Sequence, residues 1–411
     1  MPKTFVPVEC LTPNSEQGPG LKILMLCWEY PPNVVGGLSR HVFSLSVHMA
    51  KMGYEVHVIT AGNDMLPAFE LMDGVRVHRV KPINEMDRNF LSWIGGLNLA
   101  MAFNAERLAQ EIRFHLIHAH DWLVGAAAIA LKELWSIPLL TTIHATELGR
   151  NNGIHTETQK FIHEKEQQLI TASNQIIVCS EYMKEHLTSV FKGVSDAIAI
   201  IPNGVEAPAT TEDRAMLFPE RNKKEYIFSI GRIVKEKGFQ TMIEAASIAK
   251  ENNLDYFFVI AGKGPMLDTY RSQINDRQLT NHIMFIGYIT DEQRNAYVAD
   301  SQLIVIPSLY EPFGIAALES MILGKPTIVS NTGGMKGIVK HLQTGLLMNP
   351  GDPESMLQQI QFLKENPIIA KEIGLKGREI VKSLYGWKRI ASETARIMED
   401  TVINSQVKDL L

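Results

Sequence analysis

Residues 303–323 read LIVIPSLYEPFGIAALESMIL, a pattern that indicates a buried strand, a turn and then a helix. The run Leu303 to Pro307 is apolar throughout, as in strands buried inside parallel sheets. The run Ala316 to Leu323 has helical character. Two carboxylates, Glu311 and Glu319, lie eight residues apart across the turn and the helix. Because open α/β sheets bind their ligands at such turns, this stretch is the first candidate for a functional site.

Glu319 is the less expected of the two carboxylates. A charged side chain on so apolar a helix costs free energy unless another group pairs with it. One interpretation is that Glu319 binds a ligand. The alternative is a glutamate near the helix start that interacts favourably with the helix dipole. Its apolar neighbours in the chain are Ala316, Ala317, Leu318, Met321 and Ile322.

Length and composition indicate a soluble protein of two domains. The chain has 411 residues, more than one ordinary domain, with 45% hydrophobic and 21% charged residues. A net charge of −5 gives no reason to expect nucleic acid or an anionic membrane surface as a partner. The longest apolar runs are far shorter than the ~18 to 20 residues of a membrane-spanning helix. Cys10, Cys27 and Cys179 form no CxxC motif, which favours a reducing, cytoplasmic location.

Strand-like and helix-like runs alternate along most of the chain. The alternation covers residues 21–201, is interrupted by the polar, aperiodic residues 207–224, and restarts at residue 226. Alternating βα units predict parallel sheets with helices on both faces. Residues 63–71 and 81–89 are expected to be loops. Residues 353–384 are expected to be helical.

The predicted fold class is α/β, with two doubly wound Rossmann-like domains whose parallel sheets face each other across a cleft. Residues 1–20 are expected to form a loose leader. The N-terminal domain is predicted to cover residues 21–205, and the C-terminal domain residues 206–386.

Two glycine-containing turns suit a phosphate. Gly36 and Gly37 lie between a strand and a helix, where backbone N–H groups can approach an anion. The segment Gly231 to Gly238 follows the first strand of the second domain and carries Arg232 and Lys237, two cations that suit a diphosphate. The alternatives are a plain turn and a solvated charged loop. Neither segment has the GxGxxG or GxxxxGK[ST] pattern of ordinary dinucleotide or P-loop sites.

Polar residues also end two strands of the first domain. His118 and His120 share one face of a strand, so a metal site is conceivable, although it needs further ligands. Packing of one histidine, with exposure of Asp121 to the cleft, is the preferred interpretation. His144 ends another strand at the same sheet edge. No Asp-x-Asp motif occurs in the chain, which disfavours metal-dependent nucleotide-sugar chemistry and predicts no metal site.

Together these motifs resemble those of retaining glycosyltransferases of the GT-B fold, family 4, and of its glycogen- and starch-synthase-like branch in particular. The resemblance covers nearly the whole chain after about residue 20. Glu311 and Glu319 match the signature of the family, Arg232 and Lys237 its diphosphate-binding pair, and Gly36-Gly37 its N-domain glycine loop. The segments that resemble the glucan-extending branch are Glu29 to Pro32, His118 to Trp122 and Ile143 to Glu147.

The resemblance implies a role for each residue at the donor. Glu311 would contact the hydroxyls of the transferred sugar, and Glu319 the ribose of the nucleotide. Arg232 and Lys237 would stabilise the leaving diphosphate. His144 would lie beside the donor sugar. Glu319 is accordingly expected to be under-paired or water-bound in the empty protein.

Further implied contacts come from the backbone and from the acceptor side. N–H groups of Phe313, Gly314 and Ile315 would hold sugar and phosphate, and Asp121 would lie near the acceptor. The last helix, from Trp387 to the end at residue 411, would cross back to the first domain.

The sequence therefore predicts a cytoplasmic, retaining, metal-independent hexosyltransferase that needs no cofactor beyond its nucleotide-sugar substrate. It would move glucose from UDP- or ADP-glucose to the non-reducing end of an α-1,4-glucan. One alternative is a family-4 enzyme with another acceptor, such as a lipid, a cell-envelope or spore-coat polysaccharide, or a small sugar. Further alternatives are a nucleotide-sugar epimerase and a non-catalytic sugar-nucleotide-binding protein. The motifs do not decide the nucleotide base, the acceptor or the oligomeric state.

Overall fold

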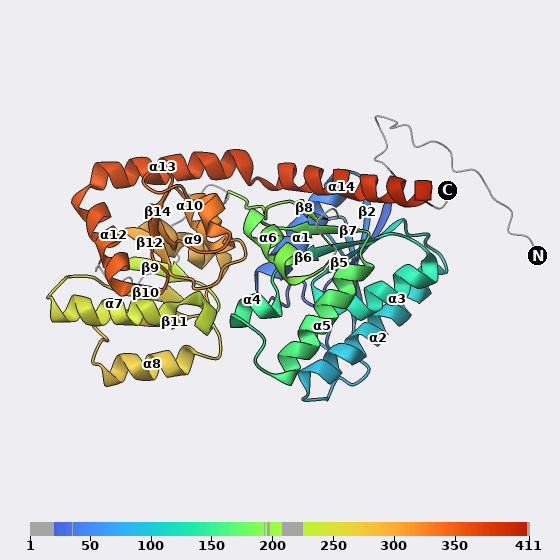
Figure 1. Ribbon diagram of the computed structural model, residues 1–411, viewed down its shortest axis with the longest axis horizontal. Helices are drawn as coiled ribbons and strands as arrows, with labels where there is room; N and C mark the ends of the chain where they lie inside the picture. Colours follow the sequence, from blue (N-terminus) through green and yellow to red (C-terminus); the bar gives the residue numbers. More distant parts are fainter. Residues whose placement is uncertain (1–19, 35, 193, 195–197, 208–224, 409–411) are drawn as a thin grey trace, which may run out of the picture. The chain divides into compact units, whose positions relative to one another are not determined.

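The computed structural model describes residues 20–34, 36–192, 194, 198–207 and 225–408 (Figure 1). Strands and helices alternate along these residues, as the sequence predicts. The expected leader, residues 1–20, lies outside the described residues except for Gly20. The expected connection, residues 207–224, lies outside them except for Ala207.

The N-terminal part of the chain forms a sheet of eight strands in the order β3-β4-β2-β1-β5-β6-β7-β8. The pairs β1–β2, β1–β5, β2–β4 and β5–β6 are parallel, and β3 runs antiparallel to β4. The strand order changes direction between β1 and β5, which is where doubly wound sheets bind ligands. The strands are β1 (Lys22–Leu26), β2 (Glu55–Ala61), β3 (Phe69–Met72), β4 (Val75–Val80), β5 (Leu116–His120), β6 (Leu139–Ile143), β7 (Gln175–Val178) and β8 (Ile198–Ile200).

Helices follow most of these strands, and their starts have local causes. Asn89, Thr146 and Ser180 are N-cap residues, each accepting a backbone N–H three residues further on. Helices α1 and α2 pack against β2 and β4, and α3 packs against β5. The helices are α1 (Gly37–Lys51), α2 (Phe90–Ala109), η1 (Trp122–Val124), α3 (Gly125–Trp135), α4 (Glu147–Asn151), α5 (Glu157–Ala172) and α6 (Glu181–Val190).

The C-terminal part forms a six-stranded sheet in the order β11-β10-β9-β12-β13-β14. All five strand pairs are parallel. Every residue of β10, β12 and β13 is buried, which explains the continuous apolar sequences of β10 and β12. The strands are β9 (Ile227–Ile230), β10 (Phe258–Ala261), β11 (Ile283–Gly287), β12 (Leu303–Ile306), β13 (Thr327–Ser330) and β14 (Leu346–Met348).

The hydrophobic core of this part includes many buried side chains of α7 and α12. Thr290 and Gln293 form a capping box at the start of α9. The helices are η3 (Lys235–Lys237), α7 (Phe239–Glu251), α8 (Leu267–Asp276), α9 (Asp291–Asp300), α10 (Ile315–Met321), α11 (Met335–Ile338), α12 (Pro353–Glu365), α13 (Pro367–Leu384) and α14 (Trp387–Lys408).

Two expectations about individual elements were wrong. Residues 63–71 are not all loop, because β3 begins at Phe69. This edge strand has no buried residue, and Phe69 and Leu71 are 55% and 65% exposed, so its pattern does not mark a buried face. The helical tail is divided at Asn366, because Pro367 lacks the N–H that would continue α12 and instead begins α13.

The chain divides into two compact units. One contains residues 1–142, 168–176 and 391–411, and the other contains residues 143–167 and 177–390. The two largely parallel sheets confirm the predicted α/β class with Rossmann-like halves. The predicted domain boundaries at residues 20, 205 and 386 stay predictions.

Candidate active site

The turn between β12 and α10 holds Glu311 in contact with Lys237. Lys237 Nζ donates to Glu311 Oε2 at 2.7 Å, and Ser308 Oγ donates to the same oxygen at 3.2 Å. The Glu311 side chain is only 10% exposed and that of Lys237 is 26% exposed. The structure thus brings together two predicted site residues that are 74 positions apart in the chain.

Backbone contacts fix the Lys237 turn against the end of β12. The amides of Leu309 and Tyr310 donate to the carbonyl of Glu236 at 2.8 and 3.2 Å. Gly238 has a φ of +69°, and a Cβ there would lie 2.0 Å from the carbonyl oxygen of Pro307. Only glycine permits this backbone conformation at so close an approach.

Arg232 lies on the same turn, but it pairs with another acid. Its guanidinium lies 3.1 Å from Glu236 Oε1, and its side chain is 47% exposed. It is therefore an accessible cation within a few residues of Lys237, as a diphosphate-binding pair requires.

A second glycine loop, Gly333-Gly334, contacts the backbone of Glu311 and was not predicted from the sequence. Gly334 N donates to the Glu311 carbonyl at 2.9 Å. A Cβ on Gly333, whose φ is +53°, would lie 2.0 Å from that carbonyl oxygen, and a Cβ on Gly334 would lie 2.3 Å from the carbonyl oxygen of Pro312. The signal was a Gly-Gly pair soon after an apolar strand.

The N-terminus of α10 completes the turn. Gly314 is the N-cap residue, with a φ of +121°, and as a glycine it has no side chain that could cap the helix. Ala317 N and Leu318 N already donate to the Gly314 carbonyl, so the amides of Phe313, Gly314 and Ile315 precede the first bonds of the helix. These amides lie at the positive end of a short helix dipole.

Glu319 has a protein partner, so the expectation that it is under-paired was wrong. Arg294 Nη1 lies 2.7 Å from Glu319 Oε1 and 3.1 Å from Asp291 Oδ1. The side chains of Arg294 and Glu319 are 12% and 13% exposed. Arg294 lies in α9, in a different βα unit from Glu319. No local sequence pattern therefore predicts this ion pair.

Residues from α4 and α6 contact the Glu311 turn within the same compact unit. Ser180 Oγ donates to the Pro312 carbonyl at 2.7 Å. The ring of Tyr310 lies so close to Gly149 that a Cβ there would be 2.4 Å from the tyrosine oxygen. Burial raises the pKa of Tyr310, which is therefore a neutral phenol at physiological pH. The sequence offered no sign of these contacts, because the segments are more than a hundred residues apart.

At the end of β5 the structure corrects the expected exposure of Asp121. Asp121 is 3% exposed, and His118 and His120 are also buried. His118 Nε2 lies 2.8 Å from Thr142 Oγ1 on the neighbouring strand. Asp121 has φ +60° and ψ 172°, a backbone conformation that non-glycine residues rarely adopt. Such strain is found most often at functional sites.

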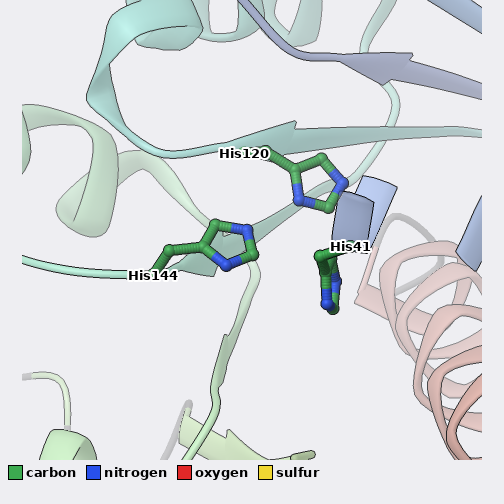
Figure 2. A group of neighbouring side chains, drawn as sticks. All are labelled: His41, His120 and His144. Atoms are coloured by element: carbon green, nitrogen blue, oxygen red, sulfur yellow. The ribbon is translucent and has the colours of Figure 1, made fainter. Parts of the chain in front are cut away.

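Three histidines gather at this sheet edge (Figure 2). His41 comes from α1, His120 ends β5 and His144 follows β6. Each offers one ring nitrogen, and these nitrogens all lie within 4.8 Å of one another. The candidate metal-ligand group is therefore His120 with His41 and His144, rather than His120 with His118. Three imidazole nitrogens at such distances could serve as ligands of a zinc-like ion.

His144 is held neutral by its surroundings. Burial, followed by the positive charge of Arg150, lowers its pKa from 6.5 to about 3. A neutral imidazole can donate from one nitrogen and accept at the other, which suits contacts with sugar hydroxyls.

The glycine loop before α1 is engaged within the protein. Gly36 N donates to Glu29 Oε2 at 3.1 Å, and Glu29 is 4% exposed. Gly37 begins the helix. The two predicted glycines thus lie at a helix start beside a buried carboxylate.

Comparisons with known proteins agree with this architecture. Residues 35–207 match the model of Glycosyltransferase Family 4, and residues 213–380 match that of Glycosyl transferases group 1. An uncharacterized glycosyltransferase of Methanocaldococcus jannaschii is 32% identical over 92% of this chain and 97% of its own length. Glycogen synthase of Mycobacterium tuberculosis is 31% identical over 92% of this chain and 94% of its own length.

Solved structures show the same fold. Sucrose-phosphate synthase from Thermosynechococcus elongatus has a TM-score of 0.82 at 23% identity, covering 92% of this chain and 98% of that chain. The catalytic domain of starch synthase IV from Arabidopsis thaliana, bound to ADP and acarbose, has a TM-score of 0.74 at 18% identity and covers 93% and 99%.

The fold is that of the GT-B glycosyltransferases, which are built from two Rossmann-like α/β halves. By sequence, the chain belongs to the glycosyltransferases in which a family 4 half is followed by a group 1 half. Among the described residues, no helix combines the length and apolarity that crossing a membrane requires.

Proposed function

We propose that the protein is a retaining, metal-independent glucosyltransferase. It moves glucose from UDP-glucose or ADP-glucose to the non-reducing end of an α-1,4-glucan. The observation that carries the proposal is the contact between Lys237 and the nearly buried Glu311 at the turn before α10. The glycogen synthase relative supports the choice of glucan.

The leaving group would be stabilised by charges already in place. Breaking a glycosyl–phosphate bond puts negative charge on the departing diphosphate. Lys237 has an ammonium with three donors, of which Glu311 takes one, and the exposed Arg232 is a second cation. Together with the N-terminal amides of α10, these groups stabilise the charge without a metal ion. Exclusion of water from the site during the reaction would protect the donor from hydrolysis.

Glu311 would bind the hydroxyls of the transferred sugar. Its carboxylate is oriented by Lys237 and Ser308, and it has further lone pairs for a ligand. Retention of configuration follows if the acceptor attacks from the face that the diphosphate leaves. Glu311 then need not form a covalent bond to the sugar.

Glu319 would accept hydrogen bonds from the ribose while Arg294 holds its orientation. An ionised carboxylate has about four lone-pair sites, so one bond from Arg294 is compatible with ribose hydroxyls on the others. Neutral His144 would lie beside the donor sugar, and Asp121 on the acceptor side. Cys27 and Cys179 are buried thiols, which fits the cytoplasmic location that we propose.

A second candidate is transfer to a small acceptor. Relatives with 25% and 26% identity are named D-inositol 3-phosphate glycosyltransferase and 2-deoxystreptamine N-acetyl-D-glucosaminyltransferase. Mass analysis of the product distinguishes a lengthened glucan from a single glycoside.

The test is incubation of the protein with UDP-glucose or ADP-glucose and maltoheptaose, with and without a chelator. The expected result is a series of longer oligosaccharides linked through α-1,4 bonds, unaffected by the chelator. Loss of activity on chelation would overturn metal independence. Absence of both transfer and nucleoside diphosphate release across a panel of donors would overturn the proposed function.

A further inference from the structure

Three aromatic side chains cluster near the end of β1. The rings of Trp28 and Phe90 meet edge to face, with centroids 6.4 Å apart. The rings of Phe90 and Trp93 are 6.5 Å apart and nearly parallel, at 11°. Phe90 is 50% exposed, and the two tryptophans are half-buried. We call Trp28, Phe90 and Trp93 the aromatic platform.

The platform lies at the switch point of the eight-stranded sheet. Leu26 of β1 pairs with Ala119 of β5. Trp28 and Asp121 therefore both follow the same rung by two residues, on adjacent parallel strands. Doubly wound sheets bind ligands at this point, beyond the carboxyl ends of the strands. Trp28 of the platform thus lies at the same level of the sheet as the strained backbone of Asp121.

Hydrogen bonds hold α2, the helix that carries Phe90 and Trp93, in position. Asn98 of α2 donates to the Leu123 carbonyl and accepts from Ala127 N, at 2.8 and 2.9 Å, which ties α2 to the segment after Asp121. Asn84 Nδ2 donates to the carbonyl of Ser92 at 2.8 Å, and Ser92 lies between Phe90 and Trp93 in the chain. The rings are therefore presented from a rigid element.

Polar residues adjoin the rings along the chain. The loop before α2 carries Asp87, Arg88 and Asn89, all exposed. Buried Glu29 follows Trp28 directly. An aromatic ring face matches the C–H groups on the faces of a pyranose, and polar residues next to the rings in the chain suit the hydroxyls of its rim.

Core packing does not account for the platform. A ring serving only the hydrophobic core would be buried, as Phe114 is at 4% exposure, whereas half of Phe90 remains exposed. The related exposed ring on α2, Phe103, is 77% exposed and lies 13 residues further along the helix than Phe90, so it offers an internal comparison.

We propose that Trp28, Phe90 and Trp93 form an acceptor subsite that binds pyranose units of an oligosaccharide by stacking. This rests on the proposed function, because it assigns a location to the acceptor of that reaction. The growing chain would lie over the platform, with its reacting end directed towards Asp121.

The experiment measures two quantities on the full-length protein. Tryptophan fluorescence during titration with maltoheptaose reports binding, and the transferase assay gives KM for maltoheptaose and kcat. The variants are Phe90→Ala, Phe90→Tyr and Trp93→Ala, with Phe103→Ala as the matched control. UDP-glucose hydrolysis without acceptor serves as the readout of the donor site.

Phe90→Ala and Trp93→Ala are each expected to weaken maltoheptaose binding and raise its KM roughly tenfold or more, the effect of losing one aromatic stacking contact. Hydrolysis of the donor should change less than twofold. Phe90→Tyr, which keeps the ring, should retain binding, and Phe103→Ala should equal the parent protein.

The inference is overturned if Phe90→Ala leaves the acceptor KM unchanged, or if Phe103→Ala raises it equally. It is also overturned if the parent protein lengthens maltoheptaose while Phe90→Ala and Trp93→Ala bind and use it as the parent does, an outcome that leaves the proposed function standing. If instead the parent protein binds maltoheptaose and Phe90→Ala weakens that binding, but no nucleotide sugar is turned over, the proposed function fails while the platform is supported.

Discussion

Lys237→Ala removes the cation that lies 2.7 Å from the Glu311 carboxylate. The change leaves a carboxylate that is 10% exposed without its charged partner. Ser308 remains as a hydrogen-bond donor to it. Two consequences follow, one for stability and one for turnover.

The stability loss lies between two known limits. Breaking a fully buried ion pair costs about 3–5 kcal/mol, and exposed pairs contribute about 1 kcal/mol or less. Because the Lys237 side chain is 26% exposed, we expect an intermediate loss of roughly 1–3 kcal/mol in the free energy of unfolding. For a domain of this size that corresponds to a Tm lower by roughly 3–10 °C.

Expressed as free energies, the loss in turnover should be larger than the loss in stability. Removing one preorganised group that stabilises transition-state charge costs about 10²–10³ in kcat. Steady-state release of nucleoside diphosphate measures this loss, and circular dichroism during heating measures the Tm. Lys235→Ala is the matched control, because Lys235 is an exposed lysine on the same turn.

A double-mutant cycle separates the pair from its surroundings. Adding Glu311→Gln to Lys237→Ala removes the uncompensated charge of the carboxylate. The double variant should therefore lose less free energy of unfolding than the two single variants lose in sum, by about 1 kcal/mol or more. If Lys237→Ala has the turnover of Lys235→Ala, Lys237 does not bind the leaving group. If the two losses in stability simply add, the contact does not couple the residues in solution.

The remaining predictions concern three other sites. Gly333→Ala should lower kcat at least tenfold, because its Cβ would lie 2.0 Å from the Glu311 carbonyl oxygen, while Gly337→Ala, where nothing lies within 4 Å of the new Cβ, should be active in the same assay. Arg294→Ala should raise KM for the nucleotide sugar several-fold and lower stability by about 1–2 kcal/mol, since Glu319 loses a 2.7 Å partner; an unchanged KM would separate Glu319 from donor binding. Burial, together with nearby positive groups, lowers the pKa of His78 to about 4, below its value in the unfolded chain. Neutral His78 therefore contributes its full share to the free energy of unfolding above about pH 6.5. This contribution, up to roughly 3 kcal/mol, is lost as the pH falls towards 4. Urea unfolding at pH 7.5 and 5 should show this loss, and His78→Gln should reduce it; equal losses in both proteins would contradict the assignment.

Most of the fold could be predicted from the sequence because its signals are local. Continuous apolar runs such as Leu303–Ile306 mark buried parallel strands, and the residues after them mark turns. The strand β3, which lies in residues expected to form a loop, buries no residue and therefore shows no hydrophobic period.

The candidate site was predicted in part. Glu311 and Lys237 were placed correctly at neighbouring turns, because both follow central strands of one sheet and such strand ends converge. The exposure of Asp121 and the lack of a partner for Glu319 were wrong. Both depend on which side chains from other βα units pack against these residues, and spacing along the chain carries no such information.

The sequence by itself determined the two α/β halves, the turn before α10 and the residue types gathered there. Only the tertiary structure decided the partners: Arg294 for Glu319, Gly334 for the Glu311 backbone, and Trp28 with Phe90 at the end of β1. The physical reason is that backbone periodicity and turn chemistry act over a few residues. Ion pairs, ring contacts and close backbone approaches arise between segments that only packing of the folded chain brings together.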